Sequence, residues 1–324
     1  MSNTPLLTVI CLCFNHEGFV EEALKSIKQQ TYTNIEIIIV DDASNDRSVD
    51  RIKESLQKYR IEATFLALKN NIGNCKAFNK ALAIAKGEFV IDFAADDVLL
   101  PHRVEDDVAC FIKYGKEYAC VFSDVEMINE QGQSIKKSYF KRDLDGKLLE
   151  TVITGDVYER VLSNPPLFSA PTITFRTSAL RQIRGYDETL AYEDFDVWIR
   201  LSRNNKFAFY DKINTLKRDL PRSLGKQFYY QRGNQLLKST LKICLKAHQM
   251  NTKKSEDISL SNSVRYHGRI AAFTGNNFLA KGYYQLYKKL NKLSFLDKLL
   301  LCSIRFNIDW SRLYIWWLQQ RKIS

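Results

Sequence analysis

Short apolar runs alternate with amphipathic segments along the first part of this chain, and this alternation limits the folds open to it. Runs of strand length lie at 7–14, 35–40, 63–68, 89–94 and 118–124. Segments with helical spacing of apolar residues lie between them, at 19–30, 48–59, 74–85 and 101–114. Strands that alternate with helices of this length form a mostly parallel sheet with helices on both faces. We therefore predict an α/β fold.

Polar side chains follow four consecutive predicted strands at their carboxyl ends. They are Asn15, the pair Asp41 and Asp42, the pair Asn70 and Asn71, and the pair Asp96 and Asp97. In parallel sheets, ligands bind beyond these strand ends. One acidic pair alone is equally well explained as a turn or as the cap of the next helix. Two acidic pairs on the same rim favour a binding edge.

The loops of this rim lack the glycine patterns that hold phosphates with backbone amides. Neither GxGxxG nor GxxxxGK[ST] follows any predicted strand, which argues against a dinucleotide-binding Rossmann domain and against a P-loop. A phosphate ligand at this rim would therefore require a metal ion. Carboxylate oxygens suit Mg²⁺ or Mn²⁺.

The cysteines and the N-terminal stretch indicate the compartment. The seven cysteines include no CxxC pair, so buried reduced thiols are favoured over a metal site. The first residues lack the basic start and cleavage site of a signal peptide, and no window approaches the roughly 20 apolar residues of a membrane span. These features predict a cytoplasmic protein.

Charge is distributed unevenly along the chain. The net charge is +11, but residues 213–324 hold 21 Lys and Arg against 5 Asp and Glu, a net of +16. Such a basic tail suggests an anionic membrane or a nucleic acid as partner. No known nucleic-acid module occurs, so we expect no nucleic acid.

Five motifs occur in a fixed order within residues 5–215. They read VICLCFN, QQTYTNIEIIIVDDASND, NIGNCKAFN, KGEFVIDFAADD and GYDETLAYEDFDVWIRL. In this order and at these spacings they resemble the inverting glycosyltransferases of family 2, of the bacterial surface-polysaccharide type. The resemblance implies a GT-A fold, a mostly parallel sheet with a Rossmann-like nucleotide-binding half. It also implies transfer of a sugar from a nucleotide-diphosphate sugar, a UDP-sugar above all, with inversion.

The resemblance assigns roles to the rim residues. The residues implied to bind the nucleotide are Asn15, Asp41, Asp42, Asn71 and Asp96. Asp97 and Asp96 are implied to hold Mn²⁺ or Mg²⁺ on the diphosphate, and which of them is the direct ligand stays open. His16 is a further candidate for a nucleotide contact, although a loop histidine is commonly only solvated. His102 is a candidate for a metal or phosphate contact.

A second acidic pair, Glu193 and Asp194, precedes a segment with helical spacing. The resemblance makes Asp194 the general base that takes the proton from the acceptor hydroxyl, with Glu193 beside it. The alternative is that both are helix N-terminal acids, favourable with the helix dipole. Val197, Trp198 and Leu201 are expected on the buried side of this helix. Asp196, two residues after Asp194, is expected to face away from the site.

Two positions depart from the family pattern. The first aspartate of the family's DxDD is Ala94 here, and a common arginine is Phe78. These two differences leave open the alternative that the protein is a non-catalytic member of the family, which binds nucleotide sugar or acts as a scaffold in polysaccharide assembly. A third alternative is a membrane-surface or nucleic-acid-binding protein without nucleotide affinity.

We divide the chain into a catalytic domain, 1–218, and a helical basic extension, 219–324. In the extension, Leu237, Leu241 and Leu245 form one apolar stripe. Near the end, Trp310, Leu313, Tyr314 and Trp317 form a second stripe. This second stripe either packs on the catalytic domain or lies on an anionic membrane. Membrane contact would suit a glycan or lipid-linked acceptor, as in lipopolysaccharide O-antigen or capsule synthesis, on the inner face of the cell membrane.

Overall fold

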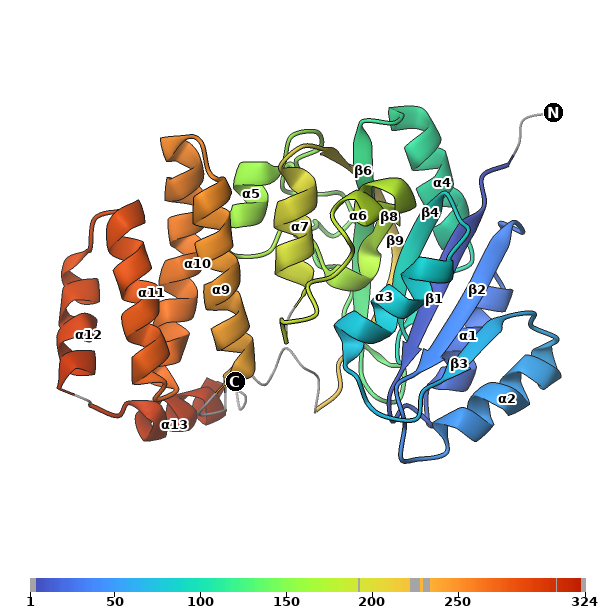
Figure 1. The fold of residues 1–324 in the computed structure, drawn as a ribbon, viewed down its shortest axis with the longest axis horizontal. Helices are drawn as coiled ribbons and strands as arrows, with labels where there is room; N and C mark the ends of the chain where they lie inside the picture. Colours follow the sequence, from blue (N-terminus) through green and yellow to red (C-terminus); the bar gives the residue numbers. More distant parts are fainter. Residues whose placement is uncertain (1–3, 192, 222–227, 230–233, 307, 322–324) are drawn as a thin grey trace. The chain divides into compact units, whose positions relative to one another are not determined.

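The computed structural model describes residues 4–191, 193–221, 228–229, 234–306 and 308–321. These residues form two compact units. We call the first, within 1–157, 168–188 and 200–220, the sheet unit. We call the second, within 158–167, 189–199 and 221–324, the helical unit. Figure 1 shows the elements of both.

The five strands predicted from the sequence are present and run in parallel. They are β1 (Leu7–Cys13), β2 (Ile35–Asp41), β3 (Thr64–Ala67), β4 (Phe89–Ala94) and β6 (Tyr118–Ile128). The mostly parallel α/β fold is therefore confirmed. Further strands complete the sheet: β5 (Val98–Leu99), β7 (Ser134–Lys136), β8 (Ile173–Arg176) and β9 (Lys206–Arg218). The order is β3-β2-β1-β4-β8-β6-β9-β5, and β7 pairs with β6.

Strand β8 separates two strands that follow one another in the first part of the chain. It pairs antiparallel with β4 on one side and with β6 on the other. The long strand β9 then pairs parallel with β6 and antiparallel with the short β5. These late strands carry the chain back to the rim at which β4 ends.

Helices cover both faces of the sheet. The predicted helices are α1 (Val20–Lys28), α2 (Ser48–Tyr59), α3 (Asn74–Ile84) and α4 (Arg103–Tyr114), and their ends differ from the expected ones by at most two residues. Side chains of α1, α2 and α4 share a buried core with Leu7, Val9 and Cys11 of β1. Helix α3 lies on the opposite face (Figure 1). Burial raises the pKa of the Cys13 thiol to about 12, in keeping with an inert, packed cysteine.

The helices of the basic tail are also present. They are α9 (Gln235–Met250), α10 (Lys254–Phe273), α11 (Asn277–Leu290), α12 (Phe295–Arg305) and α13 (Ser311–Arg321). Short helix α5 (Tyr158–Leu162) packs against α10 within the same unit. No helix among the described residues is long and apolar enough to cross a bilayer.

The buried face of α9 differs from the stripe expected from leucine spacing. Leu237 is fully buried, but Leu245 is 45% exposed. The buried face instead uses small and branched residues, among them Thr240, Ile243 and Ala247. Spacing alone placed Leu237, Leu241 and Leu245 on one face, whereas close helix packing favours smaller side chains.

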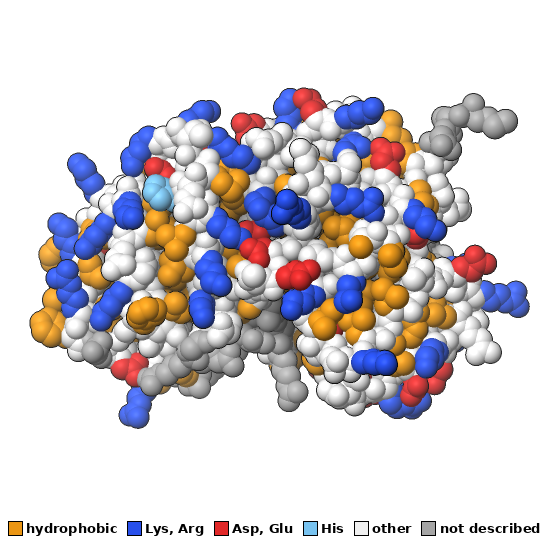
Figure 2. All heavy atoms as spheres, in the orientation of Figure 1, with side chains coloured by type: hydrophobic (Ala, Val, Ile, Leu, Met, Phe, Trp, Pro, Cys, Tyr) orange, Lys and Arg blue, Asp and Glu red, His pale blue; other side chains and the backbone are white. Residues whose placement is uncertain are grey.

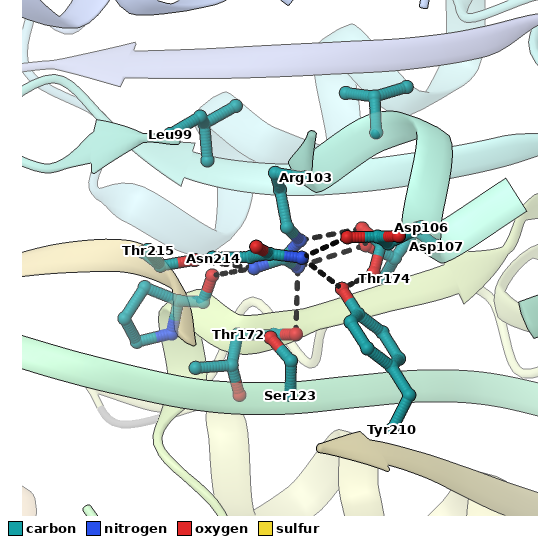
Figure 3. A network of polar contacts seen from close by, with 12 residues as sticks. Leu99, Arg103, Asp106, Asp107, Ser123, Thr172, Thr174, Tyr210, Asn214 and Thr215 are labelled. Carbon is teal, nitrogen blue, oxygen red and sulfur yellow. Dashed lines mark hydrogen bonds and ion pairs between the residues drawn. The ribbon is translucent and has the colours of Figure 1, made fainter. Parts of the chain in front are cut away.

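One buried arginine joins four elements of the sheet unit. The Arg103 side chain, with no exposed area, donates from Nε to Asp107 Oδ2 over 2.6 Å. Its Nη atoms reach the backbone oxygens of Pro171 and Thr172, in the 3₁₀ turn Ala170–Thr172. The remaining contacts go to hydroxyl groups, those of Thr174 on β8 and Thr215 on β9. Figure 3 shows that these groups converge on the guanidinium from several elements.

The Asp107 carboxylate is satisfied as completely as its partner. It accepts from the Thr174 hydroxyl over 2.5 Å and from the Tyr210 hydroxyl over 2.6 Å. Burial raises the pKa of Asp107, while the nearby Arg103 charge lowers it. A buried pair of this kind is tolerated only with all its hydrogen bonds in place.

Replacing Arg103 by methionine should therefore destabilise the fold strongly. Arg103→Met keeps much of the side-chain volume but leaves Asp107 buried without a cation. We expect the free energy of unfolding, measured by urea denaturation, to fall by about 3–5 kcal/mol. The matched control is Arg51→Met, which removes an exposed ion pair to Glu54 (3.2 Å) and should cost less than about 1 kcal/mol. Equal losses in the two variants would contradict the structural role of Arg103.

Candidate active site

The loop after β1 and the loop after β2 hold each other in place. The Asn15 backbone N–H donates to Ser44 Oγ over 2.9 Å, and the Asn45 N–H donates to Asn15 Oδ1 over 2.8 Å. Asn15 adopts a left-handed backbone with φ 57°, a conformation that asparagine tolerates better than most residues. These hydrogen bonds join the two loops at the rim.

The acidic pair after β2 forms hydrogen bonds with two loops. Both Asp41 carboxylate oxygens accept from Ser44, from its backbone N–H over 2.9 Å and from its hydroxyl over 2.6 Å. The Asp42 carboxylate accepts from the backbone N–H groups of Ile72 and Gly73, each over 2.8 Å. A carboxylate has about four acceptor positions, so Asp42 keeps capacity for a further donor.

Asn71 lies beside Asp42, as the rim hypothesis requires. Its side-chain amide donates to the Asp42 backbone oxygen over 3.1 Å. Gly73, at the start of α3, has φ 85°, a backbone conformation that other residues rarely adopt. Asp41, Asp42 and Asn71 are thus brought together from two strand ends.

The two carboxylates after β4 have different surroundings. Asp97 is 5% exposed, and its Oδ1 accepts the Arg218 backbone N–H over 2.8 Å. The Asp96 side chain is 18% exposed, and its Oδ2 lies 3.9 Å from His16 Nε2. Asp96 therefore faces the loop after β1, whereas Asp97 faces the end of β9.

Burial, and then the charge of Asp96, raise the pKa of Asp97 to about 8. The charges of Lys217 and Arg218 lower it, but they do not offset the burial. The ionised form of Asp97 is therefore disfavoured at this position, mainly by the loss of solvation and then by repulsion from Asp96. A bound cation would favour the ionised form.

Arg218, which the sequence analysis did not single out, joins the acidic turn to its neighbours. Its Nε donates to the Asp96 backbone oxygen over 2.9 Å, and its Nη2 donates to Glu22 Oε2 over 2.6 Å. Its guanidinium also lies 4.9 Å from the centre of the Phe19 ring. Local sequence carries no signal for this role, because Arg218 is 122 residues from Asp96.

The two histidines proposed near the rim have separate surroundings. His16 lies against Asp96, and its Nδ1 atom is buried without a hydrogen-bond partner in the described structure. His102 is exposed and lies 3.2 Å from Glu105 and 3.3 Å from Thr31, beyond the end of α1. Since α1 begins at the rim, His102 lies near the opposite end of that helix.

Two of the sequence motifs contact each other directly. Asn79 of NIGNCKAFN exchanges hydrogen bonds of 2.9 Å with the backbone N–H and oxygen of Tyr186. A Cβ atom on neighbouring Gly185, where φ is 65°, would lie 2.4 Å from Asn79 Oδ1. Phe78 is fully buried, with its ring 4.5 Å from that of Tyr186. Phe78, which stands where the family commonly has an arginine, is therefore a core residue.

Glu193 and Asp194 lie at the start of α7 (Asp194–Ser202), in a segment of the helical unit. Glu193 is 7% exposed, and its backbone oxygen accepts the Val197 N–H over 3.1 Å. Asp194 is partly buried. Asp196 is almost fully buried, and its Oδ1 lies 3.1 Å from Lys246 Nζ. The burial expected for Val197, Trp198 and Leu201 is confirmed.

The described residues suit a divalent cation only in part. No three His, Cys, Asp or Glu side chains in this portion of the chain are grouped to hold a metal ion. Mg²⁺ and similar ions are commonly held by one or two carboxylates together with substrate phosphates. Asp96, which is partly exposed and follows the pattern of a carboxylate beside a second carboxylate, fits such a shared site. Asp97 fits it less well, because it is 5% exposed and one of its two carboxylate oxygens already accepts the Arg218 backbone N–H.

Comparison with known proteins agrees with this geometry. The family model "Glycosyl transferase family 2" matches residues 8–182. An uncharacterized glycosyltransferase of Haemophilus influenzae is 25% identical over 311 residues, 95% of this chain and 93% of the relative. The putative glycosyltransferase EpsE of Bacillus subtilis is 28% identical over 203 residues, 62% of this chain and 68% of the relative.

Solved structures share the fold. Residues 1–349 of S. aureus TarS, crystallised with UDP-GlcNAc, align with a TM-score of 0.68 and 20% identity, covering 93% of this chain and 88% of that one. The mannosyltransferase PcManGT from Pyrobaculum calidifontis, in complex with GDP-Man and Mn²⁺, aligns with a TM-score of 0.56 and 15% identity. It covers 98% of this chain and 84% of that one. This chain therefore belongs to glycosyl transferase family 2 and has a GT-A-like α/β fold.

Proposed function

We propose that this protein transfers a sugar from a UDP-sugar to a hydroxyl group of a glycan or lipid-linked acceptor, with inversion at the anomeric carbon. The observation that carries the proposal is the acidic rim, where carboxylates from β2 and β4 lie at the carboxyl ends of parallel strands. Family membership and the nucleotide sugars named for TarS and PcManGT support it.

The residues of the rim would bind the donor. Asp42 has remaining acceptor capacity for an N–H or hydroxyl of the nucleotide, beside Asn71 and Asn15. Asp41 would keep the loop around Ser44 in shape. Asp96 would hold Mn²⁺ or Mg²⁺, which when bound stabilises the negative charge of the leaving diphosphate. Asp97 would support this turn through Arg218.

Asp194 would take the proton from the acceptor hydroxyl, which then attacks the anomeric carbon. Its position at the start of α7 leaves it partly buried, a setting that suits a general base better than full exposure. We further propose residues 1–218 as the catalytic domain and 219–324 as an extension that associates with the inner face of the cell membrane. Synthesis of a surface polysaccharide, an O-antigen or a capsule, would be the setting.

A matched pair of variants tests the metal assignment. Asp96→Asn should lose most Mn²⁺-dependent UDP binding, measured by titration calorimetry, because an amide is a poor ligand for the cation. Asp97→Asn keeps an acceptor for the Arg218 N–H and should retain most of that binding. The opposite result would make Asp97 the metal ligand. Unchanged wild-type transfer after EDTA treatment would reject the metal altogether.

The Asp97→Asn variant also gives a prediction on how the stability of the fold depends on pH. In metal-free protein the pKa of Asp97 is raised from 3.8 to about 8, so the folded state binds the proton more tightly than the unfolded state. Wild-type stability should therefore fall as the pH rises through this range. The Asp97→Asn variant has no carboxyl group to ionise at this position, so it does not lose this stability. Its melting temperature, relative to that of wild-type protein at the same pH, should therefore rise between about pH 4 and about pH 8. A constant difference between the two proteins would contradict the buried-charge explanation.

A third test concerns the base. Asp194→Asn keeps the size of the side chain but cannot take a proton, so turnover should fall by about 10²-fold or more while donor binding is retained. Glu193→Gln is the comparison variant, and its loss should be smaller. Near-normal turnover in Asp194→Asn would move the base elsewhere, with Glu193 the first alternative. A product with retained anomeric configuration would reject single displacement.

A non-catalytic member that binds nucleotide sugar in an assembly complex is the second candidate. Ala94, at the position of the family's first metal-motif aspartate, favours it. Hydrolysis of a UDP-sugar in the presence of Mn²⁺ separates the two candidates, because only an enzyme releases UDP. A thermal-shift series with UDP-, GDP- and dTDP-sugars would identify the donor nucleotide.

A further inference from the structure

Helix α12 carries an apolar stripe on the side that faces away from its own unit. Phe295 and Leu299 of this helix and Phe306, the residue directly after it, are 73%, 52% and 77% exposed, and Cys302 is exposed between the last two. Spacings of four, three and four residues place all of them on one helical face. Asp297 and Ile304, on the other side of the helix, are fully buried. The helix is therefore apolar toward solvent and packed on its inner side.

Basic side chains follow one edge of this stripe. Lys298 and Arg305 are exposed and lie on the same side of Phe295, Leu299 and Phe306 by helical spacing. Further exposed cations lie on the flanking segments, at Lys288, Lys289, Lys292 and Arg312. In Figure 2 the helices of this unit show orange and blue side chains with little red.

Acidic groups are scarce on the same helices. Between residues 277 and 321 the only acids are Asp297 and Asp309. Asp297 has no exposed area and lies 3.0 Å from Arg265 and 3.1 Å from Arg269. Asp309 is the other acid of this stretch, where it is outnumbered by the Lys and Arg residues.

The tryptophan stripe at the end of the chain is partly occupied by internal packing. Tyr314 stacks on Phe273 of α10 with ring centres 5.5 Å apart, and Trp317 stacks on Tyr314 at 5.9 Å. Trp310 donates from Nε1 to Ser303 Oγ over 3.0 Å. Leu313 and Trp316, on the side left over, are 58% and 56% exposed. Of the stripe expected from the sequence, Trp310 and Tyr314 thus contact other parts of the unit, whereas Leu313 is exposed and Trp317 remains 41% exposed.

We propose that the outer face of α12 docks on an anionic bilayer. Phe295, Leu299 and Phe306 would enter the boundary between headgroups and acyl chains, while Lys298 and Arg305 pair with lipid phosphates. Apolar side chains bordered by cations are the pattern of helices that lie in the plane of a membrane interface. With no spanning helix among the described residues, contact would stop at that interface.

The charge of the surface argues against other occupants. A symmetric contact between two copies of this chain would bring the same cations together, which costs electrostatic free energy. A nucleic acid would neutralise the cations but would leave the phenylalanines and leucine without an apolar partner. An anionic bilayer satisfies both features at once. The proposal rests on the proposed function in one respect, since docking would bring the enzyme to a lipid-linked acceptor.

Vesicle co-sedimentation with the full chain tests the surface. The probes are phosphatidylcholine vesicles with and without phosphatidylglycerol. Wild-type protein should sediment with the anionic vesicles and much less with the neutral ones. The triple variant Phe295→Ser, Leu299→Ser, Phe306→Ser should bind at least about tenfold more weakly, because three large apolar side chains no longer enter the interface. Wild-type-like binding by a folded triple variant would overturn the proposal.

Two control variants show whether weaker vesicle binding by the triple variant comes from this surface, and not from a general loss of apolar surface or from unfolding. Serine at Ile112, Ile135 and Leu144, which are exposed in the sheet unit, should leave vesicle binding unchanged. Lys298→Gln with Arg305→Gln, which keeps the apolar stripe, should weaken binding to anionic vesicles and reduce its dependence on salt. If the triple variant does not fold, the Lys298→Gln, Arg305→Gln variant tests whether this face binds the bilayer. A wild-type dimer that the triple variant converts to a monomer, without vesicle binding by either, would assign the face to self-association instead.

A parallel assay separates this inference from the proposed function. Transfer to a short soluble acceptor should be the same in wild-type protein and in the triple variant, because the rim and Asp194 are untouched. Transfer to a lipid-linked acceptor in anionic vesicles should fall in the triple variant. Vesicle binding without any transfer by wild-type protein would leave the docking surface standing and reject the proposed function.

Discussion

The contact between the end of β9 and the acidic turn after β4 determines the geometry of the candidate site. Arg218 donates its backbone N–H to Asp97 and its side chain to the Asp96 backbone oxygen. The same guanidinium reaches Glu22 at the start of α1 and the backbone oxygens of Asn129 and Glu130 after β6. One cation therefore holds the turn, the first helix and the end of a central strand in a single arrangement. A side chain with five N–H donors in a planar fork is suited to this task, and lysine would not replace it.

The rest of β9 explains why Arg218 arrives at this place. Tyr210 and Thr215, on the same strand, belong to the buried cluster around Arg103 and Asp107. That cluster fixes β9 against α4 and β8, because a buried ion pair is stable only when its donors and acceptors are all matched. The stability of the sheet unit and the shape of the rim thus depend on the same strand.

The rim combines groups that serve the fold with groups that remain available. Asp41 and Asp97 use carboxylate oxygens to hold backbone amides, and both are almost fully buried. Asp42 does the same but keeps acceptor positions, and Asp96 is partly exposed beside His16. Within each acidic pair, one carboxylate therefore mainly stabilises the local backbone, and the other remains available to a ligand. The repulsion between the adjacent carboxylates Asp96 and Asp97 is a physical reason to expect a cation at this turn.

The sequence by itself determined the alternation of strands and helices and the composition of the rim. These features depend on local periodicity, and parallel strands bring their carboxyl ends to one edge whatever the rest of the chain does. Asn15, Asp41, Asp42, Asn71, Asp96 and Asp97 could all be named for that reason. Tertiary structure alone decided that β8 enters between β4 and β6, that Arg218 supports the acidic turn, and that Asp96 rather than Asp97 is partly exposed. It also decided that α12 packs through the face with Asp297, Ser303 and Ile304 and leaves its apolar face exposed. Helical spacing shows which residues share a face, but only the packing of neighbouring elements determines which faces they cover.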